Sequence, residues 1–354
     1  MYKKLVVKIG SNVITNEDGL LNEEVFSSLV DQIATLRKKG VEIILVTSGA
    51  TAAGRSIIKI PQKTPSIVER QVLASFGQVK LMKMYQKLFA PYEILCSQVL
   101  ATKEDFRDRL HYLNMKNCFE GLIEHGAIPI VNENDVISVT ELMFTDNDEL
   151  AGLIASMMKT NALILLTSVD GIYNGDPKKK TSRVIQYVTK DTDLSGFITK
   201  DRSSFGRGGM HTKIRIAKKL SSLGITTHIA NGKQKDILLN IENNGTSFVP
   251  DQCVIASNVK RWIAHAEGYE KGEIIVDEGA EKALKEKTAS LLPVGIKKIL
   301  GEFERGDIIK ILNVKDHVLG YGQAQYGSKT AKKYRGKKDK RALIHQDYIF
   351  IHHD

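Results

Sequence analysis

The chain has 354 residues, of which 42% are hydrophobic and 26% are charged. This is ordinary globular composition with enough apolar surface for a core, which excludes a largely disordered chain. Lys and Arg outnumber Asp and Glu by 51 to 41, and the net charge of +10 favours anionic partners without indicating a fold. Three distant cysteines without metal-ligand spacing, Cys96, Cys118 and Cys253, favour reduced thiols over a disulfide framework.

Charged residues interrupt every apolar stretch well before the roughly 18 residues that a membrane span requires. Lys8 also ends the first apolar run too early for a signal peptide. We therefore expect a soluble, cytoplasmic protein with no membrane partner.

Up to about residue 230, short apolar segments alternate with segments whose apolar residues recur every three or four positions. The first pattern is typical of buried strands and the second of amphipathic helices. The predicted strands are 3–9, 41–47, 93–97, 127–131, 162–167 and 225–230. The predicted helices are 22–39, 66–88, 112–125, 148–159 and 213–223.

Continuous apolar strands separated by helices predict an α/β/α sandwich with a mainly parallel central sheet. Ligands of such sheets bind beyond the carboxyl ends of the strands. Glycine and polar residues directly follow four of the predicted strands. Their position predicts that these four segments form one shared ligand site. These segments are Gly10–Ser11–Asn12, Ser48–Gly49–Ala50, Asn132–Glu133–Asn134–Asp135 and Ser168–Val169–Asp170–Gly171.

Past Gly268 the pattern changes to β-like segments at 272–276, 307–314 and 345–351 around one helix at 280–287. Turn signals are dense at Pro293–Val–Gly295, Arg305–Gly–Asp307 and Gly320–Tyr–Gly322. We predict a first domain at 1–255, a linker at 256–271 and a small, mostly β domain at 272–354. Eight basic residues against one acid lie within 329–341, which we interpret as a solvated loop rather than a nucleic-acid patch.

Two lysines are candidate anion ligands. Lys8 lies near the end of a buried strand, where an ammonium group is unusual unless it meets an anion or reaches solvent. Lys213 ends the glycine-rich segment 205–213, which opens a helix and could present backbone N–H groups to phosphate oxygens. The spacing is not that of a Walker loop. We interpret His211 as a first-turn helix residue rather than a general base, and no histidine spacing indicates zinc.

The remaining polar clusters could bind charged groups of a ligand. The small residues of 47–54 could bind a carboxylate or phosphate, or could simply form a tight strand–helix junction. Residues 132–135 and 146–148 together offer carboxylates and amides for an α-amino group, for the lysines or for Mg²⁺. Taken alone, Asp146 or Asn147 is an ordinary helix N-cap.

These motifs recur in order in the glutamate 5-kinases of the amino-acid kinase superfamily, which the chain resembles over nearly its whole length. The resemblance rests on Lys8–Ile–Gly–Ser–Asn12, Ser48–Gly–Ala50, Gln78 after Gly77, Pro129 to Asp135, Asp146–Asn–Asp148, Thr167 to Pro177 and Gly208 to Lys213. The tail resembles the PUA domain often fused to these kinases, through Val276 to Ala280, Ser290 to Pro293 and Gly301 to Asp307.

The resemblance implies phosphorylation of the γ-carboxylate of L-glutamate by ATP, the first step of proline biosynthesis. It also implies Mg²⁺, a homo-oligomer (dimer or tetramer) and feedback inhibition by proline. It gives catalytic roles to Lys8, Lys213 and Asp148, with Asp148 orienting the lysines. Glutamate would be held by Ser48, Gly49, Ala50, Asn134, Asp135 and Asn147, with Asp135 meeting its ammonium. The nucleotide would be held by Lys8, Gly10, Thr167, Ser168, Arg207, Gly208, Gly209, Met210, His211, Thr212 and Lys213. No side chain is predicted as a metal ligand.

Three positions depart from the family pattern: Ser168 replaces an Asp, Thr145 a Gly and Arg207 a Thr. Two alternatives remain open at this stage. The acceptor could be N-acetylglutamate, aspartate, carbamate or a nucleoside monophosphate. The chain could instead act through its second domain and basic segment as an RNA-binding protein, an interpretation that we do not favour because it leaves the first domain's site unexplained.

Overall fold

The computed structural model describes residues 2–138, 146–176, 179, 181–190, 192, 194, 209–250, 257–286 and 289–352. The chain divides into two units, Met1–Val254 and Ile255–Asp354. The second unit takes in the segment predicted as a linker, which contains the short helix α8 (Asn258–Ile263).

An eight-stranded sheet forms the centre of the first unit, in the order β3-β4-β2-β1-β5-β7-β8-β6. Neighbouring strands are parallel except β7 and β8, which are antiparallel. The strands are β1 (Lys4–Ile9), β2 (Glu42–Thr47), β3 (Cys96–Ala101), β4 (Ile128–Glu133), β5 (Ala162–Thr167), β6 (Tyr187–Val188), β7 (Thr226–Asn231) and β8 (Thr246–Phe248).

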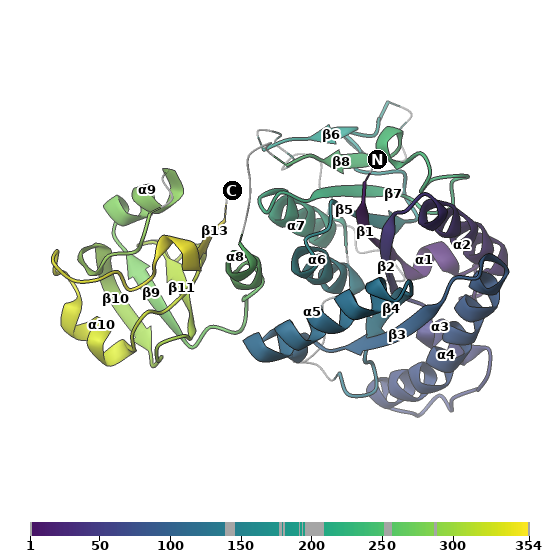
Figure 1. Cartoon of the computed structure of the whole chain (residues 1–354), viewed down its shortest axis with the longest axis horizontal. Helices are drawn as coiled ribbons and strands as arrows, with labels where there is room; N and C mark the ends of the chain where they lie inside the picture. The colour runs from purple at the N-terminus through teal and green to yellow at the C-terminus, as the bar shows by residue number, and fades with distance from the viewer. Residues whose placement is uncertain are drawn as a thin grey trace. The chain divides into compact units, whose positions relative to one another are not determined.

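Helices cover both faces of this sheet (Figure 1). Helices α2 and α4 lie on one face, and α5, α6 and α7 lie on the other. Within the described residues, no helix is both long enough and apolar enough to span a membrane. The helices are α1 (Ser11–Ile14), α2 (Glu23–Lys38), α3 (Ala50–Arg55), α4 (Ser66–Phe89), α5 (Arg109–Glu124), α6 (Asn147–Met157) and α7 (Met210–Ser221), with 3₁₀ turns η1 (Ala90–Tyr92), η2 (Lys103–Phe106) and η3 (Ile241–Asn243).

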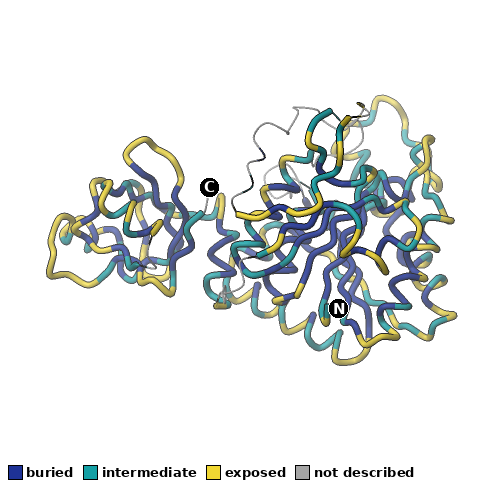
Figure 2. Tube along the Cα trace, turned by 90° about the horizontal axis from the view of Figure 1, so that it is seen from above, coloured by how far each residue is buried: buried dark blue, intermediate teal, exposed yellow. Residues whose placement is uncertain are grey.

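The alternation of side chains along β1 sets the two layers. Leu5, Val7 and Ile9 point toward α2 and α4 and join a buried core with Phe26 and Tyr85. Because successive side chains of a strand point to opposite faces, Lys8 lies on the side of α6 and α7. Figure 2 shows the central strands as the most deeply buried part of this unit.

The predicted α/β/α sandwich with a mainly parallel sheet is confirmed. Each predicted strand of the first unit has a counterpart, although β3 begins three residues later than predicted and continues to Ala101. The sequence patterns missed β6 and β8, which are only two and three residues long.

A five-stranded sheet in the order β10-β9-β11-β12-β13 forms the second unit. Its apolar core includes Ile274, Ile309 and Ile344. The elements are β9 (Gly272–Val276), α9 (Glu278–Glu286), η4 (Pro293–Gly295), β10 (Ile296–Gly301), β11 (Ile308–Leu312), β12 (Val318–Gln323), α10 (Ser328–Tyr334), η5 (Gln346–Tyr348) and β13 (Ile349–Ile351).

Two predictions for this unit were wrong in part. Gly320–Tyr–Gly322 lies within strand β12 rather than in a turn. Glycine is needed at position 320 because β13 pairs closely there, and a Cβ would lie 2.0 Å from the carbonyl oxygen of Phe350. The basic segment 329–341 is not a loop throughout, since its first part forms α10, anchored by buried Ala331. All eight of its basic side chains are exposed, as expected.

Candidate active site

The four strands followed by polar or glycine segments are neighbours in the sheet, in the order β4-β2-β1-β5. All three pairings among them are parallel, so their carboxyl ends lie at one edge. The predicted shared site is therefore a geometric consequence of the strand order.

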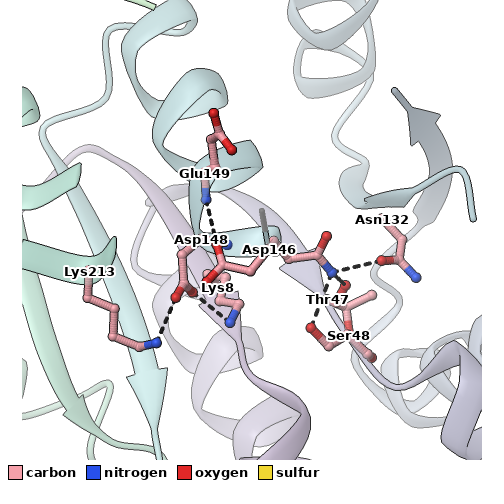
Figure 3. Close-up of polar contacts among 9 residues, drawn as sticks. Lys8, Thr47, Ser48, Asn132, Asp146, Asp148, Glu149 and Lys213 are labelled. Atoms are coloured by element: carbon pink, nitrogen blue, oxygen red, sulfur yellow. Dashed lines mark hydrogen bonds and ion pairs between the residues drawn. The ribbon is translucent and has the colours of Figure 1, made fainter. Parts of the chain in front are cut away.

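A buried carboxylate at this edge joins the two predicted catalytic lysines (Figure 3). The Nζ atom of Lys8 lies 2.6 Å from Oδ1 of Asp148, and that of Lys213 lies 2.7 Å from Oδ2. Asp148 is fully buried, and the lysines are only 6% and 8% exposed. Since an ammonium group has three N–H donors, each lysine can bind Asp148 and an anion at the same time.

The packing of α6 against α7 places Asp148 next to Lys213. A Cβ on Gly152 would lie 2.8 Å from the Ile216 side chain, so the glycine permits close approach of the two helices. Gly152 lies one turn after Asp148, and Ile216 lies one turn after Lys213, so the same contact brings the charged pair together.

Asp146 caps the first turn of α6. Its Oδ1 accepts hydrogen bonds from the backbone N–H groups of Asp148, at 2.9 Å, and Glu149, at 3.1 Å, which confirms the N-cap interpretation of Asp146. Its Oδ2 is buried and accepts no hydrogen bond from any described residue.

The two aspartates have opposite electrostatic environments. Burial alone raises the pKa of Asp148, but the ammonium groups of Lys8 and Lys213 outweigh it and hold the pKa below its usual range. Burial and the neighbouring Asp148 charge raise the pKa of Asp146 to about 6. Asp148 is therefore ionised at neutral pH. Asp146, with a pKa of about 6, is still partly protonated just below neutral pH.

A hydrogen-bonded network lies beside the lysine pair, between β2, β4 and α6. Nδ2 of Asn147 lies within donor distance of Thr47 O (2.8 Å), Ser48 Oγ (3.1 Å) and Asn132 Oδ1 (2.9 Å). Nδ2 of Asn132 donates to Oε1 of the buried Gln78 at 3.0 Å. Asn147 and Ser48, both predicted to hold substrate, are thus joined by one network. Figure 3 shows Thr47, Ser48 and Asn132 of this network.

The backbone turn after β2 depends on glycine. Gly49 has φ = +100° and precedes the first helical residue, Ala50. A Cβ on Gly77 of α4 would lie 1.7 Å from the Ala50 carbonyl oxygen, so α3 and α4 approach closely here. The same approach brings Gln78 to the network.

The segment after β4 is held by α4. Asp135 lies with Oδ1 3.3 Å from Nε of Arg70, and a terminal nitrogen of Arg70 donates to the carbonyl of Ser138 at 2.8 Å. Asn134 is half-buried in the same turn, and its backbone N–H donates to Ala101. Asp135 therefore faces a guanidinium group that the sequence patterns did not predict.

The predicted nucleotide residues lie after β5 and at the start of α7. Thr167 is half-buried and Ser168 is exposed. Gly209 precedes α7, and His211 lies in the first turn of this helix, as predicted. Met210 and Thr212 are half-buried, and His211 is exposed. Arg207, Gly208 and the departure at Thr145 lie outside the described residues.

Gly10 keeps the region beside Lys8 open. A Cβ there would lie 3.4 Å from Lys8 Nζ and 3.1 Å from the Leu166 carbonyl. Asp170, which follows β5, binds other side chains. Its Oδ1 accepts hydrogen bonds from the side-chain amides of Asn231 and Gln234, at 2.9 Å each. These hydrogen bonds lower the pKa of Asp170, which acts as a structural acceptor.

Sequence reasoning missed Arg70 entirely and gave no individual role to Gln78 or Asn132. Gln78 was only one of the residues that carry the family resemblance, and Asn132 was only one member of the polar cluster 132–135. Arg70 and Gln78 lie on one long helix whose pattern indicated only a core face. Asn132 had a usable signal, because it is the first residue of the polar cluster that follows the apolar part of β4.

The amino acid kinase family model matches residues 3–231, and the PUA domain model matches residues 272–343. The chain is 50% identical to a glutamate 5-kinase of Bacteroides thetaiotaomicron, with 99% of each protein covered. It is 46% identical to a glutamate 5-kinase of Chlorobaculum tepidum, with 99% of this chain and 98% of that protein covered.

Solved structures share the fold of the first unit. A carbamate kinase from Giardia lamblia bound to AMP-PNP matches with a TM-score of 0.51 at 18% identity, over 70% of this chain and 99% of that one. An isopentenyl phosphate kinase substrate complex matches with a TM-score of 0.52 at 17% identity, and the match covers 70% of this chain and 99% of that one.

Proposed function

The chain belongs to the amino acid kinase family and, within it, to the glutamate 5-kinases, and we propose that it transfers the γ-phosphoryl group of ATP to the γ-carboxylate of L-glutamate. The product is L-glutamyl 5-phosphate, and the reaction is the first step of proline biosynthesis. The observation that supports this chemistry most strongly is the buried arrangement of Lys8, Asp148 and Lys213.

The reaction needs cations more than it needs a base. A γ-carboxylate is already ionised at pH 7, so no residue has to remove a proton from the nucleophile. Phosphoryl transfer depends mainly on in-line positioning and on neutralising the charge of the transferring group. Lys8 and Lys213 supply two positive charges in a water-poor site, and Asp148 holds both ammonium groups in place.

The glutamate substrate lies over the ends of β2 and β4 in this proposal. The Ser48 hydroxyl and the backbone at Gly49 and Ala50 bind a carboxylate of glutamate, and Asn147 adds its side-chain amide. Asn134 and Asp135 hold the α-ammonium group. Support comes from the shared network of Ser48 and Asn147 and from the half-buried position of Asp135 at the same sheet edge.

The nucleotide lies between β5 and α7. Lys8, Lys213 and Gly10 contact its phosphates, and Thr167, Ser168 and the 207–212 segment hold the rest. The first turn of α7 adds backbone N–H groups and the positive end of the helix dipole, which favours phosphate.

Mg²⁺ is part of the proposal. Among the described residues, no three His, Cys, Asp or Glu side chains could together hold a metal ion. Mg²⁺ needs no such set, because it is commonly bound by one or two carboxylates plus substrate phosphates. The buried, unpaired Oδ2 of Asp146 fits that requirement, and the bound ion would neutralise phosphate charge.

The acceptor can be tested with purified full-length protein, ATP, Mg²⁺ and hydroxylamine. We expect γ-glutamyl hydroxamate with L-glutamate and little product with N-acetylglutamate, aspartate, carbamate or a nucleoside monophosphate. Asp135→Ala and the shape-conserving Asp135→Asn should both raise the KM for glutamate at least about tenfold, the cost of about 1.4 kcal/mol for losing a charge-assisted contact. Turnover of another acceptor, with none of glutamate, would refute the proposal.

Three further properties are proposed on the family relationship. The chain forms a homo-oligomer, proline inhibits it, and the kinase domain (1–255) is joined by residues 256–271 to the PUA-like domain (272–354). A cytoplasmic location and the absence of RNA binding by the second domain stay predictions.

A further inference from the structure

Gln78 of α4 is a buried glutamine beside the candidate site, and one half of its amide has no partner. It is only 9% exposed, although glutamine is mostly a surface residue. Its Oε1 accepts a hydrogen bond from Nδ2 of Asn132 at 3.0 Å. Its Nε2 is buried and donates to no described residue. An apolar side chain of similar length would fill this space without a buried, unpaired donor, so packing alone does not explain a glutamine here.

A chain of side-chain amides leads from Gln78 toward the ligand side of the network, and the backbone fixes its direction at two points. Oδ1 of Asn132 accepts the N–H of Glu133 at 2.9 Å, which orients the Asn132 amide. Nδ2 of Asn147 lies 2.8 Å from the carbonyl oxygen of Thr47, which can only accept, and 2.9 Å from Oδ1 of Asn132. The amides of Asn132 and Asn147 therefore each have one defined orientation.

This orientation leaves two complementary groups for a ligand. Asn147 is half-buried, and its Oδ1 accepts no hydrogen bond from any described residue. Ser48 Oγ lies 3.1 Å from Nδ2 of Asn147, which is itself a donor, so the hydroxyl hydrogen of Ser48 is directed elsewhere. Asn147 thus offers an acceptor, which suits an ammonium group, and Ser48 offers a donor, which suits a carboxylate.

Turning the Asn147 amide over would reverse the polarity of the site. Its oxygen would then face the Thr47 carbonyl and Oδ1 of Asn132, and its nitrogen would face the ammonium group of a ligand. Asn132 opposes this change only while its own oxygen faces Asn147. Gln78 stabilises that state of Asn132, because its Oε1 accepts the hydrogen bond from the opposite end of the amide.

We propose that Gln78 and Asn132 are positioning residues for glutamate, which orient the Asn147 amide so that its oxygen, not its nitrogen, faces the α-ammonium group. Both are buried, and neither touches the substrate. The inference rests on the proposed function and refines its glutamate site. Lys8 and Lys213 bind Asp148 and lie outside this chain of amides, so the positioning acts on glutamate binding rather than on phosphoryl transfer.

Steady-state kinetics of the full-length protein in the hydroxamate assay tests the proposal. Gln78→Met keeps the length of the side chain but removes the acceptor, and should raise the KM for glutamate at least about tenfold, with kcat and the KM for ATP within about twofold. Gln78→Glu keeps an acceptor oxygen and should return the KM for glutamate to within about threefold of the original value. Met82→Leu, at another buried residue of α4, is the control and should change none of these values.

Two further measurements separate orientation from packing. Asn132→Leu breaks the same hydrogen bond from its other end, and adding Gln78→Met to it should raise the KM for glutamate no further, because both residues act through one chain. Glutarate has both carboxylates of glutamate but no α-amino group. Its inhibition constant should stay within about twofold in Gln78→Met, because it makes no bond to the Asn147 oxygen.

An unchanged KM for glutamate in folded Gln78→Met would overturn the inference, and so would an equal weakening of glutarate and glutamate. Thermal melting followed by circular dichroism checks that each variant is folded. Should Gln78→Met not fold, Asn132→Leu decides by the same two readouts. Failure of the proposed function has a different signature, since the original protein would then form no hydroxamate from glutamate, and this refinement would be refuted with it.

Discussion

Replacing Asp148 by Asn should destabilise the first unit strongly, because it leaves two buried ammonium groups without their shared counter-ion. Asp148 is fully buried and lies within 2.7 Å of Lys8 Nζ and Lys213 Nζ. Removing one partner of a buried ion pair typically costs about 3–5 kcal/mol. For a unit of this size, each kcal/mol lowers the melting temperature by about 2–4 °C, so we expect a decrease of about 6–20 °C.

Differential scanning calorimetry measures this loss, with Asp18→Asn as the control at an exposed aspartate. The pKa of Asp148 is lowered in the folded state, so its contribution to the free energy of unfolding is fully present above about pH 4 and is lost as the pH falls through the folded pKa. The difference in stability between Asp148→Asn and the original protein should therefore shrink as the pH falls below about 4. A variant as stable as the Asp18→Asn control would refute the reasoning.

Three more substitutions test separate parts of the account. Lys213→Ala should lower kcat by at least about 10²-fold with a small change in the KM for glutamate, because it removes charge stabilisation of the transition state. Asp146→Asn keeps the helix cap and should raise the free energy of unfolding by about 1–3 kcal/mol at pH 8, because the pKa of about 6 shows that the charged form is disfavoured in the folded state. Gly77→Ala should be strongly destabilising, because its Cβ would lie 1.7 Å from a backbone oxygen of α3.

Each of these has a matched comparison. Lys218→Ala, at an exposed lysine of the same helix, should leave kcat unchanged, and equal kcat for both variants would remove Lys213 from the mechanism. The gain from Asp146→Asn should vanish below about pH 4, where the carboxyl is protonated in both states, and a loss at pH 8 would contradict the electrostatic assignment. Gly121→Ala in α5 meets no atom within 4 Å and should stabilise by about 0.5–1 kcal/mol, whereas equal effects at both glycines would contradict the packing argument.

The sequence predicted the central strands most reliably, because burial alone determines their residue pattern. The strands at the centre of the sheet, such as β1 and β5, are buried on both faces, so their apolar runs are unambiguous. Their strand-end residues could be assigned to one edge because parallel strands align their carboxyl ends. This is why the segments after β1, β2, β4 and β5 could be assigned to one site, whereas the joint role of Lys8 with Lys213 on α7 came from the family resemblance.

Sequence patterns did not predict the features that depend on contacts between distant parts of the chain. The two glycines of β12 resemble turn residues, and only the approach of β13 explains them. Helix α10 was not predicted, because its lysines outnumber its buried residues and the segment therefore has no clear apolar face. The partner of Asp135 could not be predicted either, because Arg70 lies 65 residues away on another element, and no local pattern encodes that distance.

The central claim is that Lys8 and Lys213 act together on one transferring phosphoryl group. A crystal structure with a non-hydrolysable ATP analogue, Mg²⁺ and L-glutamate tests it most directly. We predict both Nζ atoms within about 3 Å of γ-phosphate oxygens, with the Asp148 carboxylate still between the lysines. A γ-phosphate beyond hydrogen-bonding reach of either lysine would contradict the account.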